Sequence, residues 1–117
     1  MAAPNIVNVA SITGKTAVQA VGTSATAIVT NSSGSNKVFK VNALYISNVD
    51  GTNAADITVD LFRSSTAYPL VSTVQVPSDS TLDLMSKAIY LEEGDSLRCT
   101  ASAASDLVAV CSYEEIS

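Results

Sequence analysis

Histidine and tryptophan are absent from this chain of 117 residues, and aromatic residues make up only 5% of it. Without histidine, the chain lacks the usual general base, the usual activator of serine and cysteine nucleophiles, and the commonest zinc ligand. Ser-His-Asp and Cys-His catalysis are therefore excluded. We predict a protein that is not an enzyme, with no catalytic residue, no cofactor and no bound metal. The lack of tryptophan also disfavours an antibody-type domain.

Positive charge is scarce as well. Six Lys and Arg residues stand against 11 Asp and Glu, which gives a net charge of -5. The basic residues are scattered, so no stripe is available to neutralise phosphates, and we expect no nucleic-acid partner. No window approaches the roughly 18 uninterrupted apolar residues of a membrane span. Since Met1 to Asn5 also lacks the regions of a signal peptide, we expect a soluble protein made in the cytoplasm, with no membrane partner.

Cysteine occurs twice, at Cys99 and Cys111, on two stretches that we expect to be neighbouring strands. Antiparallel pairing across a short loop would set Cys99 opposite Val108 and Cys111 opposite Ser96, a poor arrangement for a disulfide. We therefore predict two buried, reduced thiols.

What the chain does contain is short apolar runs with period-2 alternation, separated by Gly, Pro, Ser, Asn and Asp. The strongest is Val38 to Asn48, and the cleanest alternation is at Ile57, Val59 and Leu61. Within the first run Leu44 and Ile46 reverse the parity, which indicates either burial on both faces or a bulge near Leu44. The pattern predicts an all-β fold: one antiparallel β-sandwich, jelly-roll or Ig-like, with about 8 to 10 strands.

The length predicts a single domain. We expect residues 14–117 to form the sandwich and residues 1–13 to be either an N-terminal arm or an edge strand. The last quarter, Ala88 to Ile116, is interpreted as a closing hairpin at the edge of the sandwich.

Two stretches imitate ligand-binding motifs. Thr13-Gly14-Lys15-Thr16 resembles the end of a phosphate-binding loop, but the glycine needed five positions before Gly14 is replaced by Val9, so we predict a plain turn. Asp50-Gly51-Thr52-Asn53 with Asp56 offers oxygen ligands for calcium but lacks the EF-hand spacing, so we predict a solvated hairpin loop.

Acidic residues gather at two places near the C-terminus. Glu92, Glu93 and Asp95 surround Gly94, and we interpret them as an exposed turn rather than a catalytic acid and base. Glu114 and Glu115 are interpreted as a solvated strand end, with pairing to a basic partner as the alternative.

Interface candidates follow from exposure expected at strand faces and ends. Phe62 falls out of parity with its apolar neighbours and is the best single candidate for an exposed anchor. The full set of interface candidates is Ile6, Val7, Val9, Phe62, Glu114 and Glu115.

Several segments carry a family resemblance, and they are distributed over nearly the whole chain. They read PNIVNV from Pro4, KVFKVN from Lys37, SNVDGTNA from Ser47, AIYLEE from Ala88 and SYEEIS from Ser112. Together they resemble small virion structural proteins of tailed phages that infect marine cyanobacteria. The resemblance implies a non-enzymatic subunit, present in many copies on a phage head or tail.

Three functional hypotheses follow. The first is a capsid decoration or cement protein on the outer head surface of the virion, where it bridges and stabilises major capsid subunits. The second is a tail, neck or baseplate accessory subunit. The third is a carbohydrate-binding module for host attachment, with Tyr68 and Tyr90 as the residues to test. A homo-oligomer is expected in the first two cases, a trimer by analogy with decoration proteins at threefold sites.

Overall fold

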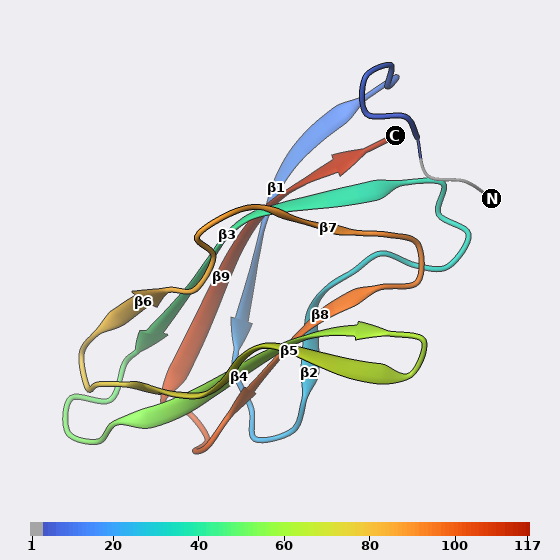
Figure 1. The fold of residues 1–117 in the computed structure, drawn as a ribbon. Coiled ribbons are helices and arrows are strands. Elements are labelled where there is room, and N and C mark those ends of the chain that lie inside the picture. The colour runs from blue at the N-terminus through green and yellow to red at the C-terminus, as the bar shows by residue number, and fades with distance from the viewer. Residues whose placement is uncertain (1–3) are drawn as a thin grey trace.

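A computed structural model describes residues 4–117 and confirms a β-sandwich of two antiparallel sheets (Figure 1). Sheet A is built from β1 (Ile12–Ala20), β9 (Leu107–Ile116), β3 (Val38–Asn48), β6 (Thr81–Asp83) and β7 (Ile89–Leu91). Sheet B is built from β2 (Thr26–Thr30), β8 (Ser96–Ala101), β4 (Ala55–Arg63) and β5 (Thr66–Val76). The described part of the chain has no helix long and apolar enough to cross a membrane.

The strand order is that of a jelly roll. Both β6 and β7 pair with β3, at Tyr45–Ser47 and Phe39–Val41, so the two short strands together occupy one place in sheet A. The sheets then read β1-β9-β3-β6/β7 and β2-β8-β4-β5. With β6 and β7 counted as one strand, the chain changes sheet at every step except the β4–β5 hairpin. This is the double Greek-key arrangement of jelly rolls. This order decides between the two topologies that the sequence left open.

Period-2 alternation explains how each strand contributes to the core. In β3 the side chains of Val41, Leu44 and Ile46 are fully buried, and the register with β9 shifts between Val41 and Ala43. That shift is the predicted bulge near Leu44: it brings residues of both parities to the same inner face. Opposite them, β4 and β8 supply Ile57 and Leu97, which are also fully buried.

The expected closing hairpin is wrong. β8 lies between β2 and β4 in sheet B, whereas β9 lies between β1 and β3 in sheet A, so each is a central strand of its own sheet. Residues 102–106 connect the two sheets instead of turning back along one of them.

The predicted pairing of the two cysteine strands is therefore wrong too. Cys99 lies beside Val59 of β4, and Cys111 lies beside Leu44 of β3. Both thiols are free and buried, as expected.

The N-terminal division of the chain also needs correction. β1 runs through the boundary expected between residues 13 and 14, and Thr13-Gly14-Lys15-Thr16 lies in this strand instead of in a turn. Within residues 4–117, β1 pairs with β9 alone and is an edge strand of sheet A. Before it, the N–H groups of Ala10 and Ser11 donate to the carbonyl oxygen of Ser117. Of the segment expected to be an arm, residues 1–3 lie outside the described residues.

Candidate functional site

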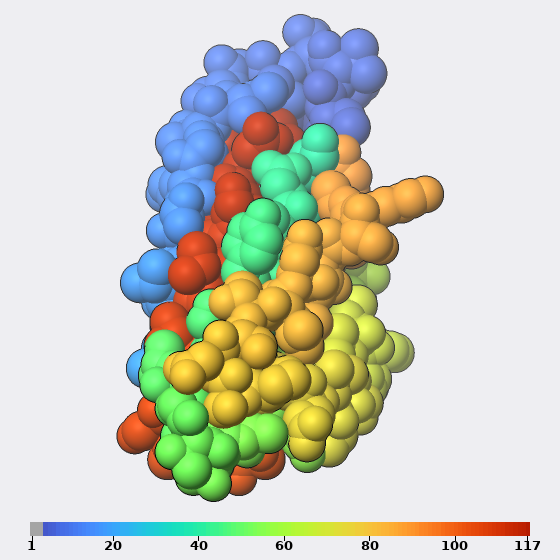
Figure 2. All heavy atoms as spheres, turned by 90° about the vertical axis from the view of Figure 1, so that its left-hand side faces the viewer, coloured from blue at the N-terminus to red at the C-terminus, as the bar shows by residue number. Residues whose placement is uncertain are grey.

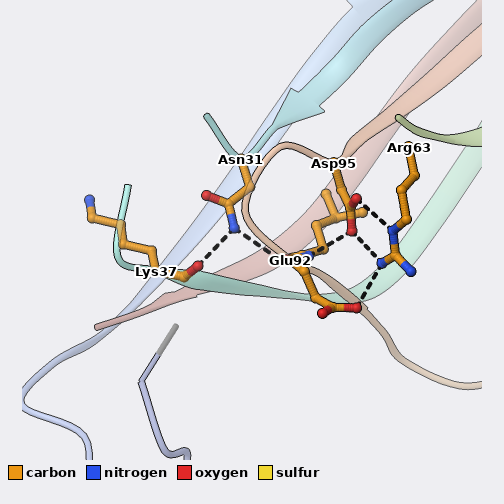
Figure 3. A network of polar contacts seen from close by, with 6 residues as sticks. Asn31, Lys37, Arg63, Glu92 and Asp95 are labelled. Carbon is orange, nitrogen blue, oxygen red and sulfur yellow. Dashed lines mark hydrogen bonds and ion pairs between the residues drawn. The ribbon is translucent and has the colours of Figure 1, made fainter. Parts of the chain in front are cut away.

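The turn before β8 contains a buried carboxylate, that of Asp95. Asp95 is only 1% exposed, so the prediction that this carboxylate belongs to an exposed turn is wrong. Its oxygens accept hydrogen bonds from Arg63 Nε at 2.8 Å, from Arg63 Nη2, and from the backbone N–H of Glu92 at 2.8 Å (Figure 3). Arg63 also donates to Glu92, which remains exposed. The two-pronged contact ties the end of β4 to the start of β8.

These contacts fix the protonation of the pair. Burial by itself raises the pKa of Asp95, but the hydrogen bonds from Arg63 and Glu92 and the charge of Arg63 outweigh it, and the pKa lies below its ordinary value. The hydrogen bond with Asp95 is the main reason that the pKa of Arg63 is raised. Both groups stay charged at neutral pH, so Asp95 is suited to holding the loop in place and not to transferring protons.

Asn31 organises the loop on the other side of this turn, and sequence reasoning missed it. Asn31 begins the loop of residues 31–36, which is rich in turn-forming residues, and its side chain is fully buried. Its side-chain amide donates to the carbonyl oxygens of Lys37 at 2.9 Å and Leu91 at 3.0 Å (Figure 3). Because the amide joins two segments far apart in sequence, no local pattern could reveal this role.

A shallow pocket of about 440 Å3 opens between these loops. Its lining combines hydroxyl groups, an aromatic ring and charge: Ser33, Phe62, Arg63, Ser64, Ser65, Glu93, Gly94 and Asp95. The strongest hydrogen-bonding groups in it, Arg63 and Asp95, already bind each other. The groups left to contact a ligand are mainly the serine hydroxyls and the ring of Phe62, which would bind a ligand only weakly.

Phe62, the expected exposed anchor, is half-buried. The guanidinium of Arg98 lies over its ring, 4.0 Å from the centroid, and the same guanidinium donates from Nε to Asp60 Oδ1 at 2.8 Å. The ring is thus partly covered by its own chain, and a role for Phe62 at an interface stays a prediction.

Glu115 is not the solvated end that the sequence suggested. Its carboxylate forms ion pairs with Lys15 at 2.9 Å and Lys37 at 3.2 Å, and its side chain is 15% exposed. The hydrogen bond from Lys15 is the largest cause of its lowered pKa. These basic partners belong to the same chain: Lys15 lies in β1, and Lys37 is the residue just before β3. Glu114 is half-buried and lies between Gly14 and Lys40 in the register of sheet A.

The remaining interface candidates lie in the segment before β1. Val7 is 91% exposed and Ile6 is 50% exposed, in a turn where the N–H of Val7 donates to Asn5 Oδ1. Val9 is half-buried. Ile6 and Val7 are therefore accessible to another molecule, and their role at an interface stays a prediction.

The loop after β3 is solvated, as predicted, but it is no hairpin, because β3 and β4 belong to different sheets. Asp50 accepts hydrogen bonds from the N–H groups of Thr52 at 2.8 Å and Asn53 at 3.2 Å, and these bonds lower its pKa. Among residues 4–117 no group of three or more His, Cys, Asp or Glu side chains is placed to hold a metal ion.

The outer face of sheet A carries apolar side chains that the sequence did not single out. Val18, Val110 and Tyr45 lie side by side on β1, β9 and β3 and form what we call the apolar row. Val18 is 72% exposed and Tyr45 is 43% exposed, whereas Ala109 and Cys111, on the opposite face of β9, are buried. Figure 2 shows this face, with β1, β9 and β3 next to one another.

Comparison with known proteins finds similarity to solved structures alone. No family model and no curated protein matches this chain. Among solved structures, it is similar to a chain from a study of Bacillus endospore appendages, described there as a family of disulfide-linked pili. The TM-score is 0.54 at 15% sequence identity, over 92% of this chain and 87% of that chain. The similarity is one of fold.

Proposed function

We propose that this chain is a non-enzymatic structural subunit of a multi-copy assembly, and specifically a capsid decoration protein on the outer head surface of a tailed phage. The observation that carries the proposal is the apolar row on the outer face of sheet A, in which Val18 and Tyr45 are exposed and Val110 between them is half-buried. Apolar side chains that adjoin one another on a protein surface, unlike scattered single ones, mark contact surfaces. The family resemblance of the sequence supplies the partner, the major capsid protein.

The physical character of the row suits such attachment. It combines one aromatic ring with two β-branched side chains on neighbouring strands, and aromatic residues are enriched among the side chains that dominate interface energies. Each contact is small, but many copies on one shell stabilise it together. An acidic chain, with net charge -5, also suits the outside of a head better than a position against packaged DNA.

A second candidate is a subunit of an extracellular filament. Its support is the shared fold with the chain from the endospore appendage study, over 92% of this chain. A tail, neck or baseplate position remains a third possibility of the same structural class.

Attachment to phage heads is the experiment that tests the proposal. Purified heads without this protein are mixed with the wild-type chain, with Tyr45→Ala, and with the matched control Tyr68→Ala. Tyr68 is 52% exposed, similar to the 43% of Tyr45, but it lies on β5 of sheet B. We expect the wild-type chain and Tyr68→Ala to bind in hundreds of copies and to raise the temperature at which heads release DNA. Tyr45→Ala should bind about tenfold more weakly, the effect of losing roughly 1.4 kcal/mol at a contact.

Other results would assign the chain elsewhere. Six or twelve copies per particle would favour the tail or neck. Filaments formed by the purified chain, without any binding to heads, would favour the second candidate. Glycan binding that is lost in Tyr68→Ala or Tyr90→Ala would favour the carbohydrate-binding hypothesis. Equal loss of head binding in Tyr45→Ala and Tyr68→Ala would contradict the assignment of the contact to sheet A.

A further inference from the structure

The four sheet edges differ sharply in how well they are protected. An exposed edge offers unpaired N–H and C=O groups to another strand, and proteins usually protect it with short strands, proline, bulges or cover. The edge made by β6 and β7 is broken into two strands of 3 residues each. In β2 the strand has 5 residues and a register shift, and Gln19 Nε2 donates to the carbonyl oxygen of Ala27. In β5 there are Pro69, two register shifts, and Thr73 at φ 52°.

β1 has none of these protections. It pairs with β9 through nine consecutive residues, Ile12 to Ala20, without a register shift and without proline. Its only charged residue, Lys15, is already engaged with Glu115 at 2.9 Å. The long open edge of the sandwich is therefore β1.

The hydrogen-bond alternation shows which groups on β1 are open. Ser11 and Ser117 exchange two hydrogen bonds of 2.9 Å, and the N–H of Val21 donates to the carbonyl oxygen of Leu107. In an antiparallel pair such bonded positions alternate with positions that face away. The backbone groups that point away from β9 thus belong to the even-numbered residues between them, and all of these residues are exposed: Ile12, Gly14, Thr16, Val18 and Ala20.

We propose that β1 pairs with β1 of a second copy of this chain, antiparallel and centred on Thr16, so that sheet A continues across a twofold axis. This register sets Thr16 against Thr16, Gly14 against Val18, and Ile12 against Ala20. Every open N–H and C=O group of the five residues then finds a partner.

Side-chain size and charge favour this occupant and register. Val18, which is 72% exposed, lies opposite Gly14, which has no side chain and where an added Cβ would have no other atom within 4 Å. Lys15 lies opposite Ala17 of the other copy, so like charges do not face each other across the axis. β1 itself contains no acidic residue, and Glu115 on the neighbouring strand β9 is paired with Lys15. A twofold contact of this kind closes on itself and yields a dimer.

Sedimentation equilibrium of the full chain, from about 1 µM to 1 mM, the range spanned by weak to moderate affinities, tests the pairing. We expect a reversible monomer–dimer equilibrium. Thr16→Pro removes an N–H that points away from β9, so the monomer should keep its fold, as thermal unfolding of dilute protein will show. Two hydrogen bonds at the axis are lost, and dimerisation should weaken at least about tenfold. Thr16→Val, which keeps the N–H, is the matched control and should still dimerise.

Disulfide trapping tests the register. Paired residues at bonded positions have Cα atoms about 5.5 Å apart, within reach of a disulfide. With a mild copper-phenanthroline oxidant, Thr16→Cys should therefore give a covalent dimer. Gly14→Cys should not, since the two copies of residue 14 would lie roughly 13 Å apart. Cys99 and Cys111 are buried and should not interfere.

A chain that stays monomeric throughout, or a dimer that survives Thr16→Pro, overturns the proposal. So does a Thr16→Pro-sensitive oligomer that Thr16→Cys fails to trap, which would mean that β1 accepts a different strand, such as the N-terminal segment of a neighbour. The pairing does not rest on the proposed function. Binding to heads is tested with Tyr45 on β3, so one proposal can fail while the other stands.

Discussion

The contact between Arg63 and Asp95 predicts an asymmetric response to mutation. Asp95 is buried to 1% exposure, while the side chain of Arg63 is 41% exposed. Removing the arginine leaves a buried carboxylate without its cation. Removing the negative charge instead leaves an arginine that can turn into water. We therefore expect Arg63→Met to destabilise the fold more than Asp95→Asn.

The exposed fractions of the two side chains also set the expected loss in the free energy of unfolding for each variant. Breaking a buried ion pair from one side costs about 3–5 kcal/mol. Because the N–H of Glu92 still donates to Asp95, we place Arg63→Met near the lower end, at about 3 kcal/mol. For Asp95→Asn we expect about 1–2 kcal/mol, since solvent screens the exposed arginine. With an unfolding entropy of about 2.1 cal/mol/K per residue, 1 kcal/mol corresponds to ~4 °C for this chain. The expected losses in Tm are ~12 °C and ~4–8 °C.

The pH dependence of stability provides an independent check on the role of Arg63. In the wild type the pKa of Asp95 is lowered, so its stabilisation is complete above the ordinary value of 3.8 and is lost as the pH falls through the folded-state pKa. In Arg63→Met burial dominates and raises that pKa, so protonation stabilises the folded state. The difference in Tm between the wild type and Arg63→Met should therefore shrink below about pH 5.

Calorimetry of both variants between pH 3 and pH 7 measures these effects, with Ser32→Ala in the exposed loop as a control expected to change little. The reasoning is refuted if Arg63→Met and Asp95→Asn lose equal stability at pH 7, or if the deficit of Arg63→Met grows on acidification.

Three further predictions concern other parts of the fold. Burial raises the pKa of Cys99 to about 12 and of Cys111 to about 11, from 9.0, so the native thiols should react with a thiol reagent at pH 8 at least about a hundredfold more slowly than in denaturant. Asn31→Ala leaves the carbonyls of Lys37 and Leu91 without a donor and should cost about 2–3 kcal/mol in urea unfolding. Ser65 has φ 60° in the β4–β5 turn, so Ser65→Gly should raise the Tm, and an unchanged or lower Tm would contradict this account of the turn.

Much of the fold could be predicted because its cause is local. Alternation of apolar residues from Val38 to Asn48 matches β3, and the reversal of parity at Leu44 matches its bulge. Strand formation and the choice of buried face depend on side chains that follow one another in sequence. The pairing of strands depends on residues far apart in sequence, and this is why the sequence alone predicts a hairpin for β8 and β9 although they belong to opposite sheets.

At the candidate site, too, features with a local cause could be predicted and features that depend on distant residues could not. The sequence correctly placed two reduced cysteines in the interior, because a free thiol behaves as a small apolar group wherever its strand lies. It failed at Asp95, Asn31 and Glu115, whose partners are 32, 60 and 100 residues away.

By itself, then, the sequence determined an antiparallel β-sandwich and excluded catalysis by histidine, since composition and period-2 patterning act over a few residues. Only the tertiary structure decided the jelly-roll order, the ion pairs and the surface. The apolar row gathers Val18, Val110 and Tyr45 from three strands, and the open edge of β1 exists because no other strand of the described chain lies beyond it. Both features depend on which strands become neighbours, and long-range packing decides that.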